Sequence, residues 1–165
     1  MPLADSLAAE LTREAEVTRR VLERVPESQL AWRPHPKSMT LGQLALHIAQ
    51  LPRGIVELLA NLDAEVPTVP LRDDASVAEI LATLDESVPF AKERLIAWGD
   101  EGLAAKWRMT RQGKTLLEMP RIGMVRSVML NHWYHHRGQL TVYLRMLDVP
   151  LPSIYGPTAD EKVFG

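Results

Sequence analysis

Residues 129–145, MLNHWYHHRGQLTVYLR, decide the fold, and they hold three of the five histidines in the chain. Their apolar residues recur at helical spacing, which predicts an amphipathic helix with one face in a core. At about 100° per residue, His136 lies about 40° from His132, and both fall inside the apolar stripe. His135 falls about 60° to the other side, and Arg137 points away from the stripe. Two imidazole rings are therefore predicted to point inward, one turn apart.

Helical periodicity also runs through three other segments, which are separated by breaks rich in proline and glycine. The four predicted helices cover about residues 4–24, 40–62, 76–99 and 120–147. Capping boxes mark two of the starts, Thr40 with Gln43 and Ser76 with Glu79. Four helices of similar length with little strand content predict an all-α fold, a four-helix bundle that forms one domain over residues 1–165.

Breaks in the helical pattern predict three further features. Pro52 lacks an amide hydrogen and leaves the carbonyl of Ile48 without its helical partner, so the second helix is expected to kink one turn after His47. Gly99 is predicted to end the third helix. The run of prolines and acids at about residues 63–75 is predicted to be a loop.

Two non-helical elements flank the fourth helix. In residues 106–119, two short alternating runs surround Gln112-Gly113, which predicts a short hairpin between the third and fourth helices. The tail DVPLPSIYGPTADE, residues 148–161, carries three prolines. It is therefore predicted to lie as an extended cover over the bundle.

Composition excludes several classes of function. A formal net charge of −2 gives no basic footprint, so no nucleic-acid partner is expected. Because the chain has no cysteine, it can form neither a disulfide framework nor a thiolate metal site, and it carries no thiol nucleophile. No apolar run approaches the ~20 residues that span a bilayer, and the N-terminus lacks the pattern of a signal peptide. We expect a cytoplasmic protein without membrane contact.

The histidines are the strongest candidates for chemistry. His47 lies at the margin of the apolar face of the second helix, so it meets His132 and His136 if the second and fourth helices are neighbours. Buried imidazoles without partners cost about 1–3 kcal/mol each, and a divalent metal would satisfy all three. The alternative is that these are ordinary core or surface histidines, because HxxxH on a helix is a weak motif. Trp133 occupies the position where zinc proteases of the HExxH type carry their glutamate, which argues against that class.

Three segments together resemble the DinB-like family of small four-helix-bundle proteins: SMTLGQLALHIAQ at 38–50, NHWYHHRGQLTVYLR at 131–145 and VPLPSIYGPTADE at 149–161. The resemblance covers nearly the whole chain. It implies a bundle whose interior holds a divalent metal, usually zinc or nickel, on three histidines. By motif position these are His47, His132 and His136. The resemblance also implies a homodimer that forms through helix faces.

The resemblance further implies a metal-dependent enzyme that acts on a small molecule, either a thiol S-transferase with a low-molecular-weight thiol as cosubstrate or a hydrolase. Gln139 and Tyr143 are expected to line the site, although both also fit a packing role. Tyr155 and Asp160 in the tail are expected to cover the mouth of the site or to act as a structural clamp. Arg137 is expected to form a salt bridge or a dimer contact. The competing hypothesis is a non-catalytic, stress-related metal-binding bundle, because no residue is an assured general base.

Overall fold

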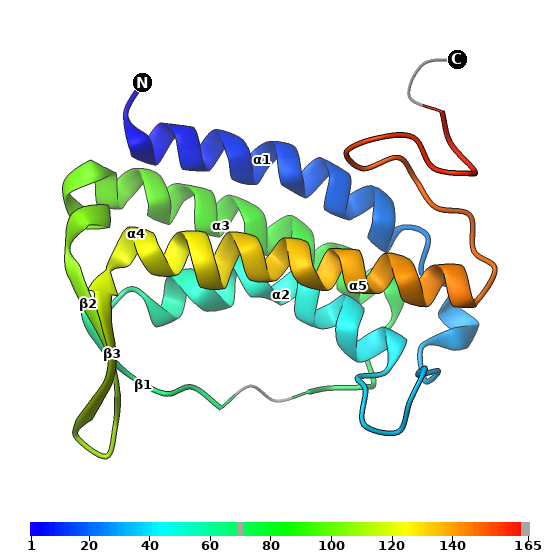
Figure 1. Ribbon diagram of the computed structural model, residues 1–165, viewed down its shortest axis with the longest axis horizontal. Coiled ribbons are helices and arrows are strands. Elements are labelled where there is room, and N and C mark those ends of the chain that lie inside the picture. The colour runs from blue at the N-terminus through cyan, green and yellow to red at the C-terminus, as the bar shows by residue number, and fades with distance from the viewer. Residues whose placement is uncertain (69–70, 163–165) are drawn as a thin grey trace.

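The computed structural model describes residues 1–68 and 71–162, so Val69 and Pro70 of the predicted loop and residues 163–165 of the predicted domain lie outside it (Figure 1). Its long helices are α1 (Leu3–Leu22), α2 (Leu41–Leu58), α3 (Val77–Ala104) and a run made of α4 (Arg121–Met124), a π-helical stretch (Val125–Asn131) and α5 (His132–Met146). A short 3-10 turn, η1 (Glu27–Gln29), follows α1. The four predicted helices are all present.

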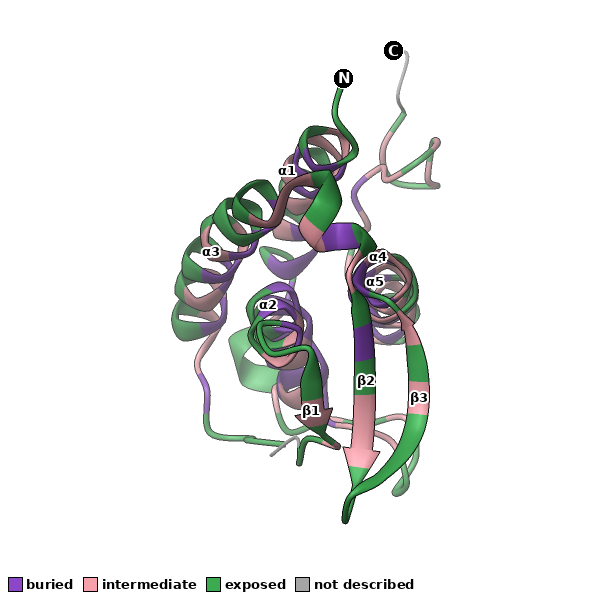
Figure 2. Ribbon diagram, turned by 90° about the vertical axis from the view of Figure 1, so that its left-hand side faces the viewer, coloured by how far each residue is buried: buried purple, intermediate pink, exposed green. Residues whose placement is uncertain are grey.

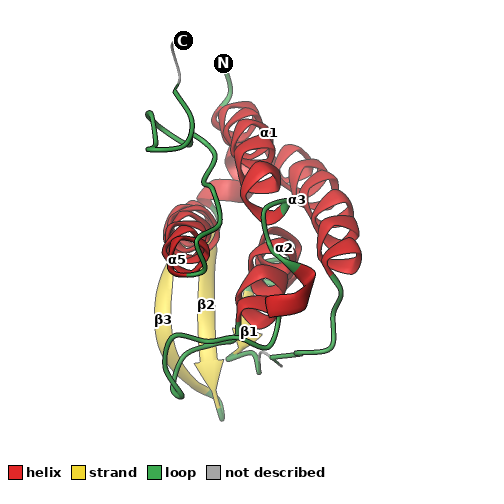
Figure 3. Cartoon of the chain, turned by 90° about the vertical axis from the view of Figure 1, so that its right-hand side faces the viewer, coloured by secondary structure: helices red, strands yellow, loops and turns green. Residues whose placement is uncertain are grey.

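The helices pack lengthwise around a continuous apolar core. α3 packs against α1 and α2, and α2 packs against the π-helical stretch and α5. Viewed from the ends of the bundle, α2 lies between α3 on one side and α5 on the other (Figures 2 and 3). This position explains the broad apolar face of α2. None of the helices in the described residues is long and apolar enough to cross a bilayer.

A small sheet lies at one end of the bundle, which corrects the all-α prediction (Figure 2). The strands are β1 (Asp63–Glu65), β2 (Lys106–Arg111) and β3 (Lys114–Pro120), in the order β1-β2-β3. β2 and β3 form the predicted antiparallel hairpin, and both Gln112 (φ 50°) and Gly113 (φ 76°) adopt the left-handed conformation that two-residue hairpin turns require. The protein is thus mostly helical with a three-stranded sheet.

β1 falls in the segment that was predicted to be a loop, and it runs parallel to β2. Its hydrogen bonds come from far along the chain: the Val66 amide donates to the Thr110 carbonyl, and the Arg108 amide donates to the Leu62 carbonyl. Three residues are too few to show an alternating pattern. The strand therefore exists because of its partner, and the local sequence carries no signal for it.

The helix boundaries follow the predicted caps, with three differences. The capping box of Thr40 and Gln43 is complete, whereas Ser76 accepts from the amide of Glu79 without the reciprocal bond. The Glu79 carboxylate instead accepts a hydrogen bond from Arg72 at 2.9 Å. Gly99 (φ 58°) interrupts α3 but does not end it, because the helix resumes and continues to Ala104. Pro120, predicted as the first helical residue, is the last residue of β3 and precedes α4.

Arg121 joins the ends of three helical segments. Its buried guanidinium donates to the carbonyl of Leu59, which caps α2, at 3.0 Å, and to the carbonyl of Gly102 in the last turn of α3. It also lies 4.4 Å from the centre of the Trp98 ring. A positive charge is favourable at the negative ends of two helix dipoles. This contact fixes the start of the helical run that carries His132.

The outward orientation predicted for Arg137 is wrong. Its side chain is 2% exposed, and it pairs with the Glu14 carboxylate at 2.7 Å and donates to the Thr18 hydroxyl of α1 at 3.1 Å. The prediction assumed one core face for the fourth helix, but α5 contacts α2 on one side and α1 on the other. The predicted salt bridge is present.

The proline-rich tail is fastened to the outside of α1 and α5 (Figure 1). The Tyr155 hydroxyl donates to Glu14 at 2.8 Å and accepts from Arg137, Asp160 pairs with Arg145, and Glu161 pairs with an arginine of α1. The tail therefore acts as a clamp between the first and last helices.

We expect the Thr40→Val variant to lose about 1 kcal/mol of unfolding free energy, because it removes the hydroxyl that caps α2. Urea denaturation measures this loss. The matched control is Thr83→Val, since the Thr83 hydroxyl only donates to the Glu79 carbonyl within α3. Equal losses in the two variants would contradict a capping role for Thr40.

Candidate metal centre

Three histidines from two helices converge inside the bundle. The ring centre of His47 on α2 lies 5.4 Å from that of His132 and 4.8 Å from that of His136, and the two α5 rings lie 4.4 Å apart. One ring nitrogen from each residue lies within 4.8 Å of the other two. The structure thus brings together the three residues that the sequence predicted as ligands.

A hydrogen bond between backbone and indole sets the two helices beside each other at this site. Pro52 has no amide hydrogen, so the carbonyl of Ile48, four residues earlier, lacks its helical donor. The indole nitrogen of Trp133 donates to that carbonyl at 2.9 Å, and both groups are buried. Ile48 follows His47 and Trp133 follows His132, so the bond lies next to both ligand-bearing positions.

The amide of Arg53, which follows Pro52, donates to the buried hydroxyl of Ser87 on α3 at 3.0 Å. Two hydrogen bonds thus connect the region around Pro52 to other helices, one to Trp133 of α5 and one to Ser87 of α3. The predicted freeing of the Ile48 carbonyl is present, and its acceptance of Trp133 could not be foreseen from the sequence, since the two residues are 85 positions apart.

A π-helical stretch, Val125–Asn131, ends directly before His132. Its wider turns were not predicted, since its residues show the same apolar spacing as an α-helix. Short π-helical segments are frequent at functional sites. His132 and His136, four residues apart, still lie about one turn apart on one side of the helix, because both belong to α5.

The ring of His136 is oriented by Gln139. The side-chain oxygen of Gln139 lies 3.0 Å from Nδ1 of His136. In this arrangement Nδ1 carries the proton and donates it to the oxygen, so the lone pair of Nε2 can coordinate a metal ion. Gln139 thus holds a ligand rather than the ion. The predicted role of Gln139 in lining the site stays a prediction.

The contact between His132 and His136 fits a shared cation. Their Nε2 atoms lie 2.7 Å apart, while Nδ1 of His132 is buried and has no hydrogen-bond partner among the described residues. If His132 donates from Nε2, its Nδ1 becomes a buried acceptor without a donor among the described residues. A cation beside the rings removes the need for this hydrogen bond, because both Nε2 atoms can then stay unprotonated and coordinate the ion.

Burial keeps the three imidazoles neutral, which is the form that binds metals. Burial, together with weaker repulsion from the neighbouring rings of His136 and His132, lowers the pKa of His47 from 6.5 to about 4. Burial also lowers the pKa of His132 and of His136. All three are therefore ready ligands at neutral pH.

Tyr143 and His135 are not part of the three-histidine group. Tyr143 packs edge-on against Trp32, with ring centres 5.6 Å apart, and its hydroxyl lies 3.5 Å from the carbonyl of Met39. Its role in lining the site stays a prediction. His135, which was not expected to be a ligand, is exposed to solvent and lies outside the three-histidine group.

A cleft of about 490 Å³ opens beside the histidines. Two of them, His47 and His132, form part of its wall. The apolar part of the wall comes from α2, the segment after β1, β2 and the π-helical stretch: Leu51, Ile55, Leu58, Pro67, Met109 and Val128. This cleft could not be predicted from the sequence, because its walls come from four separate segments.

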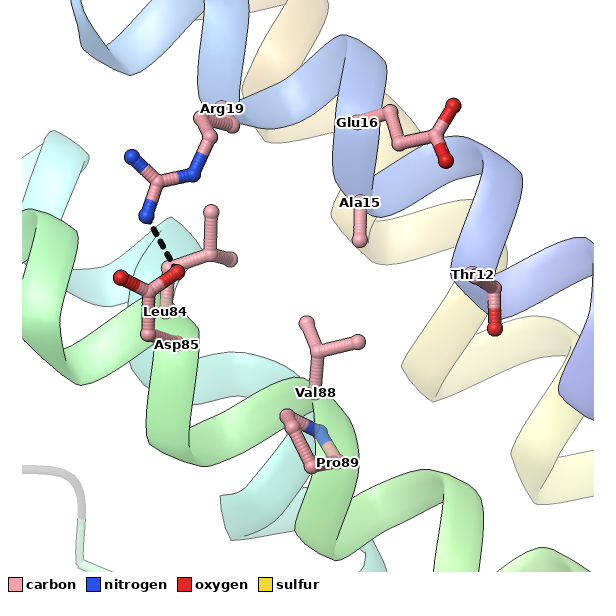
Figure 4. Close-up of a pocket in the computed structure, with 8 residues that line it drawn as sticks. All are labelled: Thr12, Ala15, Glu16, Arg19, Leu84, Asp85, Val88 and Pro89. Atoms are coloured by element: carbon pink, nitrogen blue, oxygen red, sulfur yellow. Dashed lines mark hydrogen bonds and ion pairs between the residues drawn. The ribbon is translucent and has the colours of Figure 1, made fainter.

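A second hollow, of about 220 Å³, lies between α1 and α3 (Figure 4). Its floor holds Ala15, Leu84 and Val88, and the ion pair of Arg19 with Asp85 closes one side. It contains no histidine and lies on helices that carry none of the three ligands. The cleft beside the histidines is the candidate substrate site because His47 and His132 form part of its wall.

The fold and the site together define a class of protein: a helical bundle with a candidate three-histidine metal centre inside it and a cleft beside that centre. The model of the DinB superfamily matches residues 10–140. The chain belongs to this superfamily.

Individual relatives agree with this assignment. The chain is 27% identical over 150 residues to the uncharacterized protein YrdA of Bacillus subtilis (strain 168), which covers 90% of this chain and 85% of the relative. A DinB-like protein of Bacillus cereus ATCC 10987 superposes with a TM-score of 0.71 at 24% identity, covering 92% of this chain and 97% of the other. The DinB-like protein YjoA of Bacillus subtilis gives a TM-score of 0.67 at 15% identity, covering 96% and 99%. These structures support the fold.

We expect Trp133→Phe to weaken metal binding about tenfold or more, because it removes the bond that holds α2 against α5. It also leaves the Ile48 carbonyl without a donor, at a cost of about 1–3 kcal/mol of unfolding free energy. Competition with a chromophoric chelator measures the first effect, and urea denaturation measures the second.

Trp107→Phe is the matched control for this experiment. Trp107 is equally buried, but its indole nitrogen has no hydrogen-bond partner among the described residues. If the two variants bind metal equally well, the Trp133 bond does not position the site.

We expect the metal-free protein to lose stability as the pH falls from about 6.5 to about 4. The folded pKa of His47 lies below its unfolded value, so the unfolded chain binds more protons in this window. The loss from His47 alone is up to about 3 kcal/mol. Denaturation at a series of pH values, with His47→Gln for comparison, measures it. Identical dependence of stability on pH in the two proteins would contradict a lowered pKa of His47 in the folded protein.

Proposed function

We propose that this protein is a metal-dependent enzyme that transfers a low-molecular-weight thiol to a small electrophilic molecule, with His47, His132 and His136 holding a divalent ion, zinc or nickel. The observation that carries the proposal is the set of three neutral ring nitrogens beside an open cleft. Closed structural zinc sites have four protein ligands, whereas sites with three leave a position for a substrate.

Three neutral ligands do not offset the charge of the ion, which therefore lowers the pKa of a thiol or water molecule that binds it. The chain's own residues hold and orient the ligands: Gln139 keeps Nε2 of His136 free, and Trp133 holds the helices together. In the overall reaction, R–SH and R′–X give R–S–R′ and HX. The sulfur forms its bond to carbon as X leaves, and the thiol proton passes to solvent.

The surroundings of the histidines favour thiol transfer over hydrolysis. Hydrolysis commonly uses a general base beside the metal, and the acid of the cleft wall, Glu57, lies ten residues beyond His47, about 15 Å along the helix. It is also paired with Arg53 at 2.8 Å. Thiol transfer needs no such base, because the ion favours the thiolate. A hydrolase is the second candidate, in which solvent takes the proton.

The test uses protein made without a histidine tag and loaded with zinc or nickel. Incubation with a low-molecular-weight thiol and monochlorobimane is expected to give metal-dependent formation of the fluorescent thioether. His136→Ala should reduce the rate at least tenfold, toward the uncatalysed reaction, because it removes one of three ligands.

His135→Ala is the matched control, because it removes an adjacent but exposed ring and should keep full activity. Absence of metal-dependent turnover with several thiols would contradict the transferase. Turnover of ester substrates in its place would favour the hydrolase, and no turnover of either kind would favour a non-catalytic metal-binding protein.

A further inference from the structure

The cleft continues from the candidate metal centre along one face of α2. His47, Leu51, Gly54 and Leu58 follow one another at helical spacing, and all four line the cleft. At 1.5 Å per residue, the stripe from His47 to Leu58 is about 16 Å long. The cleft is therefore elongated, with the histidines toward one end and the sheet toward the other, where Met109 of β2 forms part of the wall.

The wall of the cleft is mainly apolar and carries one charged group. That group is Glu57, and the guanidinium of Arg53 pairs with it at 2.8 Å. The other polar side chains of the wall, apart from the histidines, are the neutral Gln50 and Thr68. Among the described lining residues there is no lysine or arginine, and the guanidinium of Arg53 is already paired with Glu57. A carboxylate or phosphate in the cleft would therefore lose its hydration without gaining an unpaired cation.

We infer that this cleft binds the electrophilic substrate, and that the substrate is an uncharged molecule with an elongated apolar body and its reactive end at the histidines. The inference rests on the proposed function and names the substrate class of that same site. A volume of about 490 Å³ is that of a typical small-molecule site. The apolar wall would supply affinity, and the lack of a cation would exclude acidic molecules.

Gly54 offers a direct way to fill the cleft. Gly54 lines the cleft, and a Cβ atom added there meets no atom within 4 Å, so a larger side chain can begin at this position without a clash. Glycine is also unfavourable inside a helix, so its replacement should not unfold α2. Gly138 is the matched control, because it is an exposed helical glycine of α5 with the same free space.

The experiment measures binding by calorimetry on the zinc-loaded, untagged protein, with alkyl hydroxamates as probes. Acetohydroxamate reports the metal centre alone. Affinity should rise about fourfold for each methylene added up to octanohydroxamate, because the chain enters an apolar cleft. The eight-carbon hydroxamate that ends in a carboxylate should lose most of this gain.

Gly54→Leu should abolish the gain from chain length and leave the binding of acetohydroxamate unchanged, whereas Gly138→Leu should change neither. If chain length has no effect, if the terminal carboxylate binds as tightly, or if Gly54→Leu keeps the gain, the inference is overturned while the metal centre stands. If acetohydroxamate itself does not bind the loaded protein, the open metal centre of the proposed function fails.

Discussion

The bond from the Trp133 indole to the carbonyl of Ile48 is the contact on which the site depends. The carbonyl is free to accept this bond because Pro52 has no amide hydrogen to donate to it. A proline inside a helix usually weakens that helix, but here it allows α2 to form a hydrogen bond with α5. The bond fixes how α2 and α5 are rotated and shifted against each other. Because His47 and His132 are the neighbouring residues, the same contact determines whether their rings meet.

The three imidazoles would be an unfavourable group in the interior without a ligand. Burial lowers the pKa of each ring, and Nδ1 of His132 lacks a hydrogen-bond partner among the described residues. A divalent ion would offset these unfavourable terms, because it coordinates neutral ring nitrogens and its binding stabilises the folded chain. Local instability of this kind is typical of a functional site, where stability of the bundle compensates for it.

Features with local causes could be predicted from the sequence. The inward direction of His132 and His136 follows from helical spacing, and the turn at Gln112-Gly113 follows from residues that tolerate positive φ. Features that depend on distant parts of the chain could not be predicted. The short strand β1 depends on hydrogen bonds from β2. Arg137 is buried because α1 covers a second side of α5, whereas the prediction assumed that only one side of this helix is buried. The cleft escaped prediction for the same reason, since four separate segments form it.

The central claim is that imidazoles from α2 and α5 hold a divalent ion, and elemental analysis of the untagged protein tests it most directly. The account predicts a single zinc or nickel ion per chain, and loss of that ion when His47 is replaced by alanine. Protein that holds no divalent metal even after incubation with zinc and nickel salts, or a His47→Ala variant with undiminished metal content, would contradict it.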